Sequence, residues 1–283
     1  MPVPPRDPQY WRGLAPDLHV GDRTARLDTL SIEPDAVGQA CASLSSGAFH
    51  LPGVLPPASL ARANAGINAV TAAGWPAAFA FAYDELWLCA RAPALVAIAR
   101  RVLGSDCGQI PHAWAHVVPP GGRGWPAHVD GPRDGRLTAW VALTDAGLDN
   151  GCMYIVDRDA APRHLGNRIG TGETLTGSEV QRLLHGARAM SAAAGDMIGW
   201  LFDVIHWGGR AGAGAPGRRG LSLEFIASSE PGSEDERLPI PLDTLPPFDV
   251  RLRAIAGGIL GYGATEPLVR RWEEVARACV ASS

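Results

Sequence analysis

Two histidines and one aspartate have the types and spacing needed to hold a metal ion. His128 and Asp130 are two residues apart in WPAHVDG, and His206 follows in LFDVIHWGG. Alternate residues of an extended chain point to the same side, so His128 and Asp130 can reach one ion. Two histidines and one carboxylate bind Fe(II) on one face and leave three positions open for a co-substrate and O2. The pattern predicts a mononuclear iron centre.

This spacing is weak evidence by itself. A His-x-Asp triplet arises easily by chance in a chain with 8 histidines and 29 acidic residues. In the alternative interpretation, His128 is a surface histidine beside an acid and His206 is held by backbone hydrogen bonds. The surrounding elements must therefore decide between the two.

Those elements change character along the chain. Residues 57–73 and 84–104 carry helical patterns, and GWPAAFAFAY between them is expected to be extended or irregular. From residue 109 onward, short strand-like runs alternate with Gly, Pro and Asp-Asn-Gly turns, which is typical of a jelly roll or barrel. The runs are IPHAWAHVV, RLTAWVALT, CMYIV, GDMIGWLF and RGLSLEFIA.

The predicted organisation is one domain over residues 1–283, with a helical region at 1–104 and a strand-rich core at 105–230. An insert at 157–193, with a short helix near 178–185, is expected to form part of the mouth or a lid. Residues 231–283 are expected to form a Pro-rich linker and a final helix near 267–278.

Composition excludes several classes of protein. No apolar run is long enough to span a membrane, and the first residues lack the apolar stretch of a signal peptide, so we expect a cytoplasmic protein. The 5 cysteines are scattered, which indicates reduced thiols. A formal charge of -4 without a basic stripe argues against nucleic-acid binding and favours a small-molecule substrate. Every basic residue is Arg, which excludes Schiff-base lysine chemistry. The oligomeric state is not indicated.

Several segments follow one another in a recognisable order between residues 105 and 228. They are His128 and Asp130, Trp140, the Asp-Asn-Gly-Cys turn at 149–152, Gly195 with Asp196, His206, and Arg218 with Arg219. In this order the chain resembles the phytanoyl-CoA dioxygenase family of 2-oxoglutarate oxygenases. One segment departs from the family: Val-Asp-Arg-Asp at 156–159 replaces a Pro-Gly-Ser-His-like segment near the substrate mouth. The resemblance therefore does not indicate the substrate.

The resemblance implies Fe(II) and 2-oxoglutarate as cofactors. A guanidinium binds the distal carboxylate of 2-oxoglutarate bidentately, and Arg218 and Arg219 are the candidates. Strand alternation places Arg218 on the face of Ser222 and Arg219 on the other. The family register favours Arg218, with Ser222 as a possible helper and Trp140 beside the co-substrate.

Other residues are candidates for the pocket wall or for substrate contact. His112, Trp114 and His116 share one face of their strand by period 2 and could line the pocket or simply belong to the core. Three further polar residues are candidates for contacting the substrate: Arg123, Asp157 and Arg210.

The implied fold is mainly β, a double-stranded β-helix (jelly-roll, cupin-like) core with flanking helices. The implied reaction is hydroxylation of an unactivated C–H bond of a small amino-acid-like or natural-product molecule, with succinate and CO2 as co-products. Desaturation, cyclisation and epimerisation use the same ligands and stay open as alternatives. A non-catalytic jelly-roll binding protein is the alternative from another class.

Overall fold

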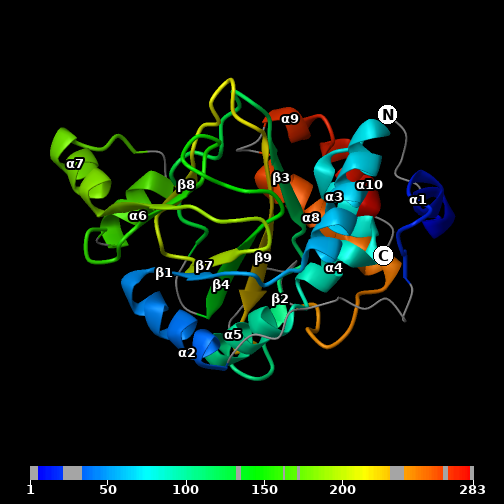
Figure 1. The fold of residues 1–283 in the computed structure, drawn as a ribbon, viewed down its shortest axis with the longest axis horizontal. Helices are drawn as coiled ribbons and strands as arrows, with labels where there is room; N and C mark the ends of the chain where they lie inside the picture. Colours follow the sequence, from blue (N-terminus) through cyan, green and yellow to red (C-terminus); the bar gives the residue numbers. More distant parts are fainter. Residues whose placement is uncertain are drawn as a thin grey trace.

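Two antiparallel β-sheets form the centre of the molecule in the computed structural model (Figure 1). The structure describes residues 6–21, 34–131, 135–161, 163–170, 173–229, 239–263 and 267–280. The larger sheet has the order β1-β7-β4-β9-β2, with β3 also paired to β9, and the smaller has the order β6-β5-β8. The strands are β1 (Ala48–Leu51), β2 (Gly108–Gln109), β3 (Trp114–Val118), β4 (Arg136–Ala142), β5 (Met153–Val156), β6 (Ala187–Met190), β7 (Met197–Leu201), β8 (His206–Gly208) and β9 (Arg218–Ile226).

Strand β4 shows how the layers pack. Six of its seven residues are buried, which requires cover on both faces of the sheet. Leu137 and Val141 belong to the large core beneath the helices, whereas Trp140 packs with Met153 and Ile155 of the smaller sheet. Alternate side chains of one strand thus enter two different cores. This arrangement confirms the predicted jelly-roll class, a double-stranded β-helix with flanking helices.

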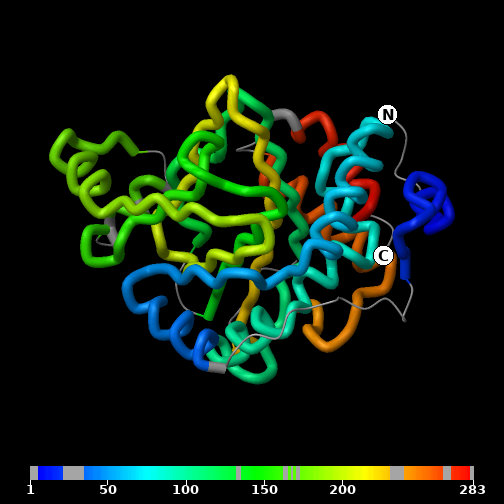
Figure 2. Tube along the Cα trace, in the orientation of Figure 1, coloured from blue at the N-terminus to red at the C-terminus, as the bar shows by residue number. Residues whose placement is uncertain are grey.

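Helices α1, α3, α4, α8, α9 and α10 lie together on one side of the sheets, and α6 and α7 lie on the opposite side of the molecule (Figure 1 and Figure 2). The helix α5 (Pro93–Leu103) begins with a proline in its first turn and ends at Gly104, whose φ of 103° suits glycine. The others are α1 (Pro8–Leu14), α2 (Pro34–Ser43), η1 (Leu44–Ser46), α3 (Pro57–Ala72), η2 (Ala77–Ala82), α4 (Asp84–Cys89), α6 (Arg163–Gly170), α7 (Gly177–Gly186), α8 (Phe248–Tyr262), α9 (Pro267–Arg270) and α10 (Glu273–Val280).

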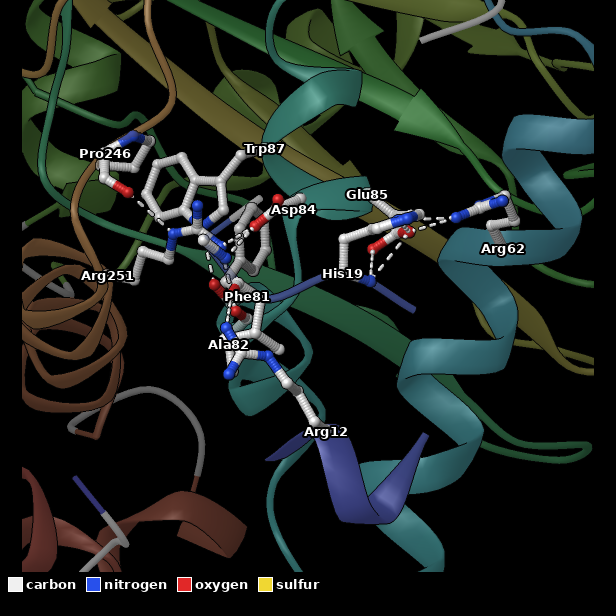
Figure 3. A network of polar contacts seen from close by, with 12 residues as sticks. Arg12, His19, Arg62, Phe81, Ala82, Asp84, Glu85, Trp87, Pro246 and Arg251 are labelled. Carbon is white, nitrogen blue, oxygen red and sulfur yellow. Dashed lines mark hydrogen bonds and ion pairs between the residues drawn. The ribbon is translucent and has the colours of Figure 1, made fainter. Parts of the chain in front are cut away.

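A buried ion pair joins α8 to the N-terminal helices (Figure 3). Arg251 on α8 donates from Nη1 to the carboxylate of Asp84 and to the carbonyl oxygen of Ala82, 3.1 Å away. Its Nε donates to the carbonyl oxygen of Pro246 at 2.9 Å. Both charged side chains are almost fully buried. The pair therefore fixes the position of α8, which contributes a residue to the site described below.

The predicted strand runs coincide with β3, β4, β5, β7 and β9, and several elements differ from expectation. GWPAAFAFAY forms the 3-10 helix η2 after Pro76, and Pro93 divides the second helical pattern into α4 and α5. The 1–104 region also contributes β1 to the larger sheet.

The later regions differ too. The 157–193 insert holds two helices and also β6, which is a strand of the smaller sheet. The C-terminal region contains the unpredicted helix α8, and the expected final helix is divided into α9 and α10. Residues 230–238 of the expected linker lie outside the described residues. In the described part of the chain, no helix combines the length and apolar character that crossing a membrane requires.

Candidate metal centre and co-substrate pocket

The three predicted ligands meet between the sheets. His128, Asp130 and His206 each offer a ligand atom, and these atoms lie within 4.8 Å of one another. The Nε2 atoms of both histidines are 3.5 Å from Asp130 Oδ1. A backbone bridge explains the meeting of residues so far apart in the sequence: His128 and His206 exchange two N–H···O bonds of 3.0 Å. The donor set fits a divalent metal held on one face.

Backbone carbonyls orient both imidazoles. His128 Nδ1 lies 2.8 Å from the carbonyl oxygen of Pro126, and His206 Nδ1 lies 3.0 Å from that of Val204. A carbonyl only accepts, so each Nδ1 carries the proton and each Nε2 presents its lone pair to the centre. This is the tautomer that a metal ligand needs.

Two hydrogen bonds to Oδ2 orient the carboxylate of Asp130. Oδ2 accepts hydrogen bonds from Thr138 Oγ1 at 2.7 Å and Trp200 Nε1 at 2.9 Å. Oδ1 is thereby left facing the histidines. The sequence analysis missed Thr138 and Trp200, which are direct partners in the β4–β7 register.

The electrostatics of the triad favour a cation. Burial lowers the pKa of His206 to about 4, so its ring is neutral near pH 7. Burial alone would raise the pKa of Asp130, but the two histidines and the Thr138 hydroxyl hold it well below its usual value. For His128, burial is outweighed by the hydrogen bond and charge of Asp130, which raise the pKa. A metal ion bound at Nε2 of His128 would therefore compete with protonation of this ring.

Arg218 is a buried cation in the same pocket. It is 3% exposed, its guanidinium carbon lies 5.4 Å from the Trp140 ring centre, and Nη1 lies 3.6 Å from Met153 Sδ. Burial lowers its pKa to about 10, which leaves it charged near pH 7. Arg218 Nε and Trp140 Nε1 are buried nitrogens without a hydrogen-bond partner among the described residues. Such atoms are rare in native structures, and here they fit a bound anion.

Arg219 lies on the opposite face of β9. Its Nη1 donates to Asn64 Oδ1 at 3.2 Å, outside the pocket. Ser222 shares the face of Arg218, and its hydroxyl lies 2.9 Å from His116 Nε2. Burial and the charge of Arg218 lower the pKa of His116 to about 3, so this ring is neutral. The structure therefore places Arg218, Ser222 and Trp140 with the triad in one pocket, which we call the metal pocket.

Other predicted residues lie elsewhere. Trp114 lines a second pocket beside the first, as does Arg123, which also forms a backbone bridge with Arg210. Asp157 is paired with Arg188 at 2.6 Å. His112 faces Glu224, with 3.8 Å between Nδ1 and Oε2.

The metal pocket also contains residues that the sequence analysis did not name. These are Trp125, Thr138, Met153, Trp200, Gly208, Glu224 and Tyr262. Tyr262 donates its hydroxyl hydrogen bond to Glu224, and burial followed by the charge of Glu224 raises its pKa well above the usual value. Strand alternation does put Glu224 on the face of Arg218 and Ser222, but the sequence analysis gave it no role in the site. Tyr262 had no signal because α8 was not predicted.

Comparison with known families agrees with this geometry. The family model described as phytanoyl-CoA dioxygenase (PhyH) matches residues 76–219, just over half of the chain. The chain belongs to the phytanoyl-CoA dioxygenase family. The match spans His128, Asp130, His206 and Arg218. No functionally curated protein matches the sequence significantly.

Solved structures similar to this family member share its fold. The non-heme alpha ketoglutarate dependent epimerase SnoN from nogalamycin biosynthesis is 19% identical, with a TM-score of 0.57 over 74% of this chain and 96% of SnoN. The carbocyclase SnoK from the same biosynthesis is 20% identical, with a TM-score of 0.54 over 78% and 97%. EctD from S. alaskensis is 17% identical, with a TM-score of 0.54 over 82% and 92%.

Proposed function

We propose that this protein is an Fe(II)- and 2-oxoglutarate-dependent oxygenase. His128, Asp130 and His206 would hold the iron, and Arg218 would bind the distal carboxylate of 2-oxoglutarate. The observation that carries the proposal is the buried guanidinium of Arg218, whose Nε has no partner among the described residues, in the same pocket as the triad. A crystal structure of SnoN is described as a complex with Fe3+ and alpha ketoglutarate, which supports the cofactor assignment.

The chain's own residues would prepare the site. The iron and 2-oxoglutarate supply the oxidising chemistry when bound together with O2. The carbonyls of Pro126 and Val204 keep the histidine lone pairs aimed at the metal position. Trp140 and Met153 shield Arg218 from water, which strengthens its attraction for a carboxylate. Ser222, on the same face of β9 as Arg218, would help to bind the same carboxylate.

An anaerobic absorption titration tests this proposal. Fe(II) and 2-oxoglutarate together should produce a visible charge-transfer band with the wild-type protein, and neither His128→Ala nor His206→Ala should produce it. Succinate release in air should require both additions. A band without any succinate release would favour a non-catalytic binding protein, and full succinate release by either variant would refute the triad assignment.

We further propose that the reaction is hydroxylation of a small amino-acid-like or natural-product molecule. This outcome needs only the triad and the co-substrate. SnoN is described as an epimerase and SnoK as a carbocyclase, so inversion and ring closure are the second candidates. Mass spectrometry of the product separates them. Hydroxylation adds one oxygen atom, ring closure or desaturation removes two hydrogen atoms, and epimerisation leaves the mass unchanged.

A further inference from the structure

A second pocket, which we call the outer pocket, opens beside the metal pocket. Including the space at its mouth it measures about 840 Å³, against about 420 Å³ for the metal pocket. His116 and Trp125 line both pockets. The two pockets therefore adjoin each other at these two rings.

Indole rings form much of the wall of the outer pocket. Trp75 and Trp272 lie 5.4 Å apart between ring centres on one part, and Trp114 and Trp125 lie 5.8 Å apart on another. The Trp125 ring is in turn 5.7 Å from that of His128. Such faces bind flat apolar groups by stacking. The inner pair of indole rings thus lies next to a proposed iron ligand.

The outer pocket carries positive charge only. Arg123 and Arg271 line it, and no Asp or Glu does. Both arginines are exposed, and neither has an acidic partner within the described part of the chain. The Arg271 guanidinium lies 5.6 Å from the centre of the Trp272 ring, which orients it beside the aromatic wall. This combination suits an anion attached to a flat apolar body.

We propose that the outer pocket seats the substrate, and that this substrate is an anionic molecule with a flat apolar ring system. Its anionic group would face Arg123 and Arg271, and its reacting carbon would point past Trp125 to the metal pocket. The metal pocket is the smaller of the two and would already hold the co-substrate, so the substrate body belongs outside it. The inference rests on the oxygenase function proposed above.

Three probes of one shape and different charge test the pocket. They are 2-naphthoate, the neutral 2-naphthamide and the cationic 2-naphthylmethylammonium. Binding is measured by calorimetry and tryptophan quenching without O2, on protein loaded with Fe(II) and saturating 2-oxoglutarate so that Arg218 is occupied. We expect 2-naphthoate to bind at least about fivefold more tightly than the amide. Equal affinities, or a preference for the cation, would overturn the proposal.

Amino-acid substitutions test which residues cause the preference for the anionic probe. Arg123→Gln combined with Arg271→Gln should abolish it, whereas Arg270→Gln, the same charge change on an exposed neighbour that does not line the pocket, should keep it. Val117 lines the pocket with 43% of its surface exposed, so replacement there is compatible with folding. Val117→Glu should repel 2-naphthoate and Val117→Gln should not. If the double variant keeps the preference, the assignment of these arginines is wrong.

Repeating the titrations on metal-free protein separates this inference from the proposed function. If the protein prefers 2-naphthoate but gives no Fe(II)/2-oxoglutarate absorption band, the outer pocket binds aromatic anions and the proposed oxygenase function is wrong. A normal band without charge preference would support the oxygenase and overturn the substrate class.

Discussion

Arg251 and Arg218 are both buried, with 1% and 3% of their surfaces exposed, yet their surroundings differ. Arg251 binds the carboxylate of Asp84 and two backbone carbonyls, and none of its buried nitrogens lacks a partner (Figure 3). Arg218 contacts a sulfur atom and an indole face, and its Nε has no partner among the described residues. The chain itself therefore supplies the hydrogen-bond partners of Arg251. Arg218 keeps a buried donor that could bind a ligand.

The difference follows from the free energy of burying charge. A buried cation loses several kcal/mol of hydration, which only hydrogen bonds and an opposite charge can offset. For Arg251 the chain itself supplies both. In the proposed function, the carboxylate of 2-oxoglutarate would supply the opposite charge for Arg218, and the free energy lost on burying this cation would be recovered on binding. Removal of the two arginines should therefore affect different properties.

Arg251→Met should give the largest effect, a loss of about 3–5 kcal/mol in the free energy of unfolding, because it leaves the Asp84 carboxylate buried without its cation. Urea denaturation of the metal-free protein measures it. Arg253→Met removes a more exposed arginine of the same helix and should change stability by less than about 1 kcal/mol. A loss of the same small size for Arg251→Met would mean that the buried pair contributes little.

Arg218→Met should leave stability within about 1 kcal/mol of wild type and weaken 2-oxoglutarate binding by about 30- to 300-fold, since a charge-assisted pair is lost. The anaerobic absorption titration gives the affinity, and urea denaturation gives the stability. Arg219→Met is the matched control and should bind 2-oxoglutarate normally. The comparison between the two buried arginines would fail if Arg218→Met proved as destabilising as Arg251→Met.

Thr138→Val should weaken Fe(II) binding by about tenfold, because Asp130 loses one of the donors that orient its carboxylate. Fe(II) affinity is measured by competition with a chromogenic chelator, and 2-oxoglutarate affinity at saturating iron should stay normal. Thr144→Val serves as control because it removes a hydroxyl that does not line the metal pocket and that accepts a hydrogen bond from the Arg219 backbone N–H. Unchanged iron affinity in Thr138→Val would show that Trp200 alone suffices.

His116 should give a pH dependence of stability rather than a change in ligand binding. Its pKa is about 3 in the folded protein and about 6.5 when unfolded, so the unfolded chain takes up the proton first as pH falls. Stability is complete above pH 6.5 and declines below it, by about 1 kcal/mol per pH unit for this residue. Denaturation of metal-free protein at pH 7 and pH 5 measures the decline. His116→Gln should reduce the decline, and an unchanged slope would contradict the buried neutral ring.

The sequence predicts the parts of the site that depend on local order. His128 and Asp130 share a side by alternation, and the same rule placed Arg218 with Ser222. The sequence analysis missed Thr138 and Trp200. Their contact depends on the register between β4 and β7, which cannot be predicted from a local sequence pattern. Tyr262 was missed because it lies on α8, a helix that the sequence analysis did not predict.

Short edge strands were equally hard to predict. Strand β1 has only four residues, too few for a clear alternating pattern, and it is recognisable only through its partner β7. The five central runs carried enough apolar alternation to predict the jelly roll, whereas the strands that complete its edges did not.

The pairing of β1 with β7 joins residues 48–51 to residues 197–201, about 150 positions later. Strand β9 is made later still, and it pairs with β2, β3 and β4. During synthesis β1 cannot pair with β7 until most of the chain has left the ribosome. Long-range pairings of this kind slow folding, because the entropy cost of closing the loop comes before the favourable free energy of the contacts. The protein is therefore expected to fold after synthesis rather than during it.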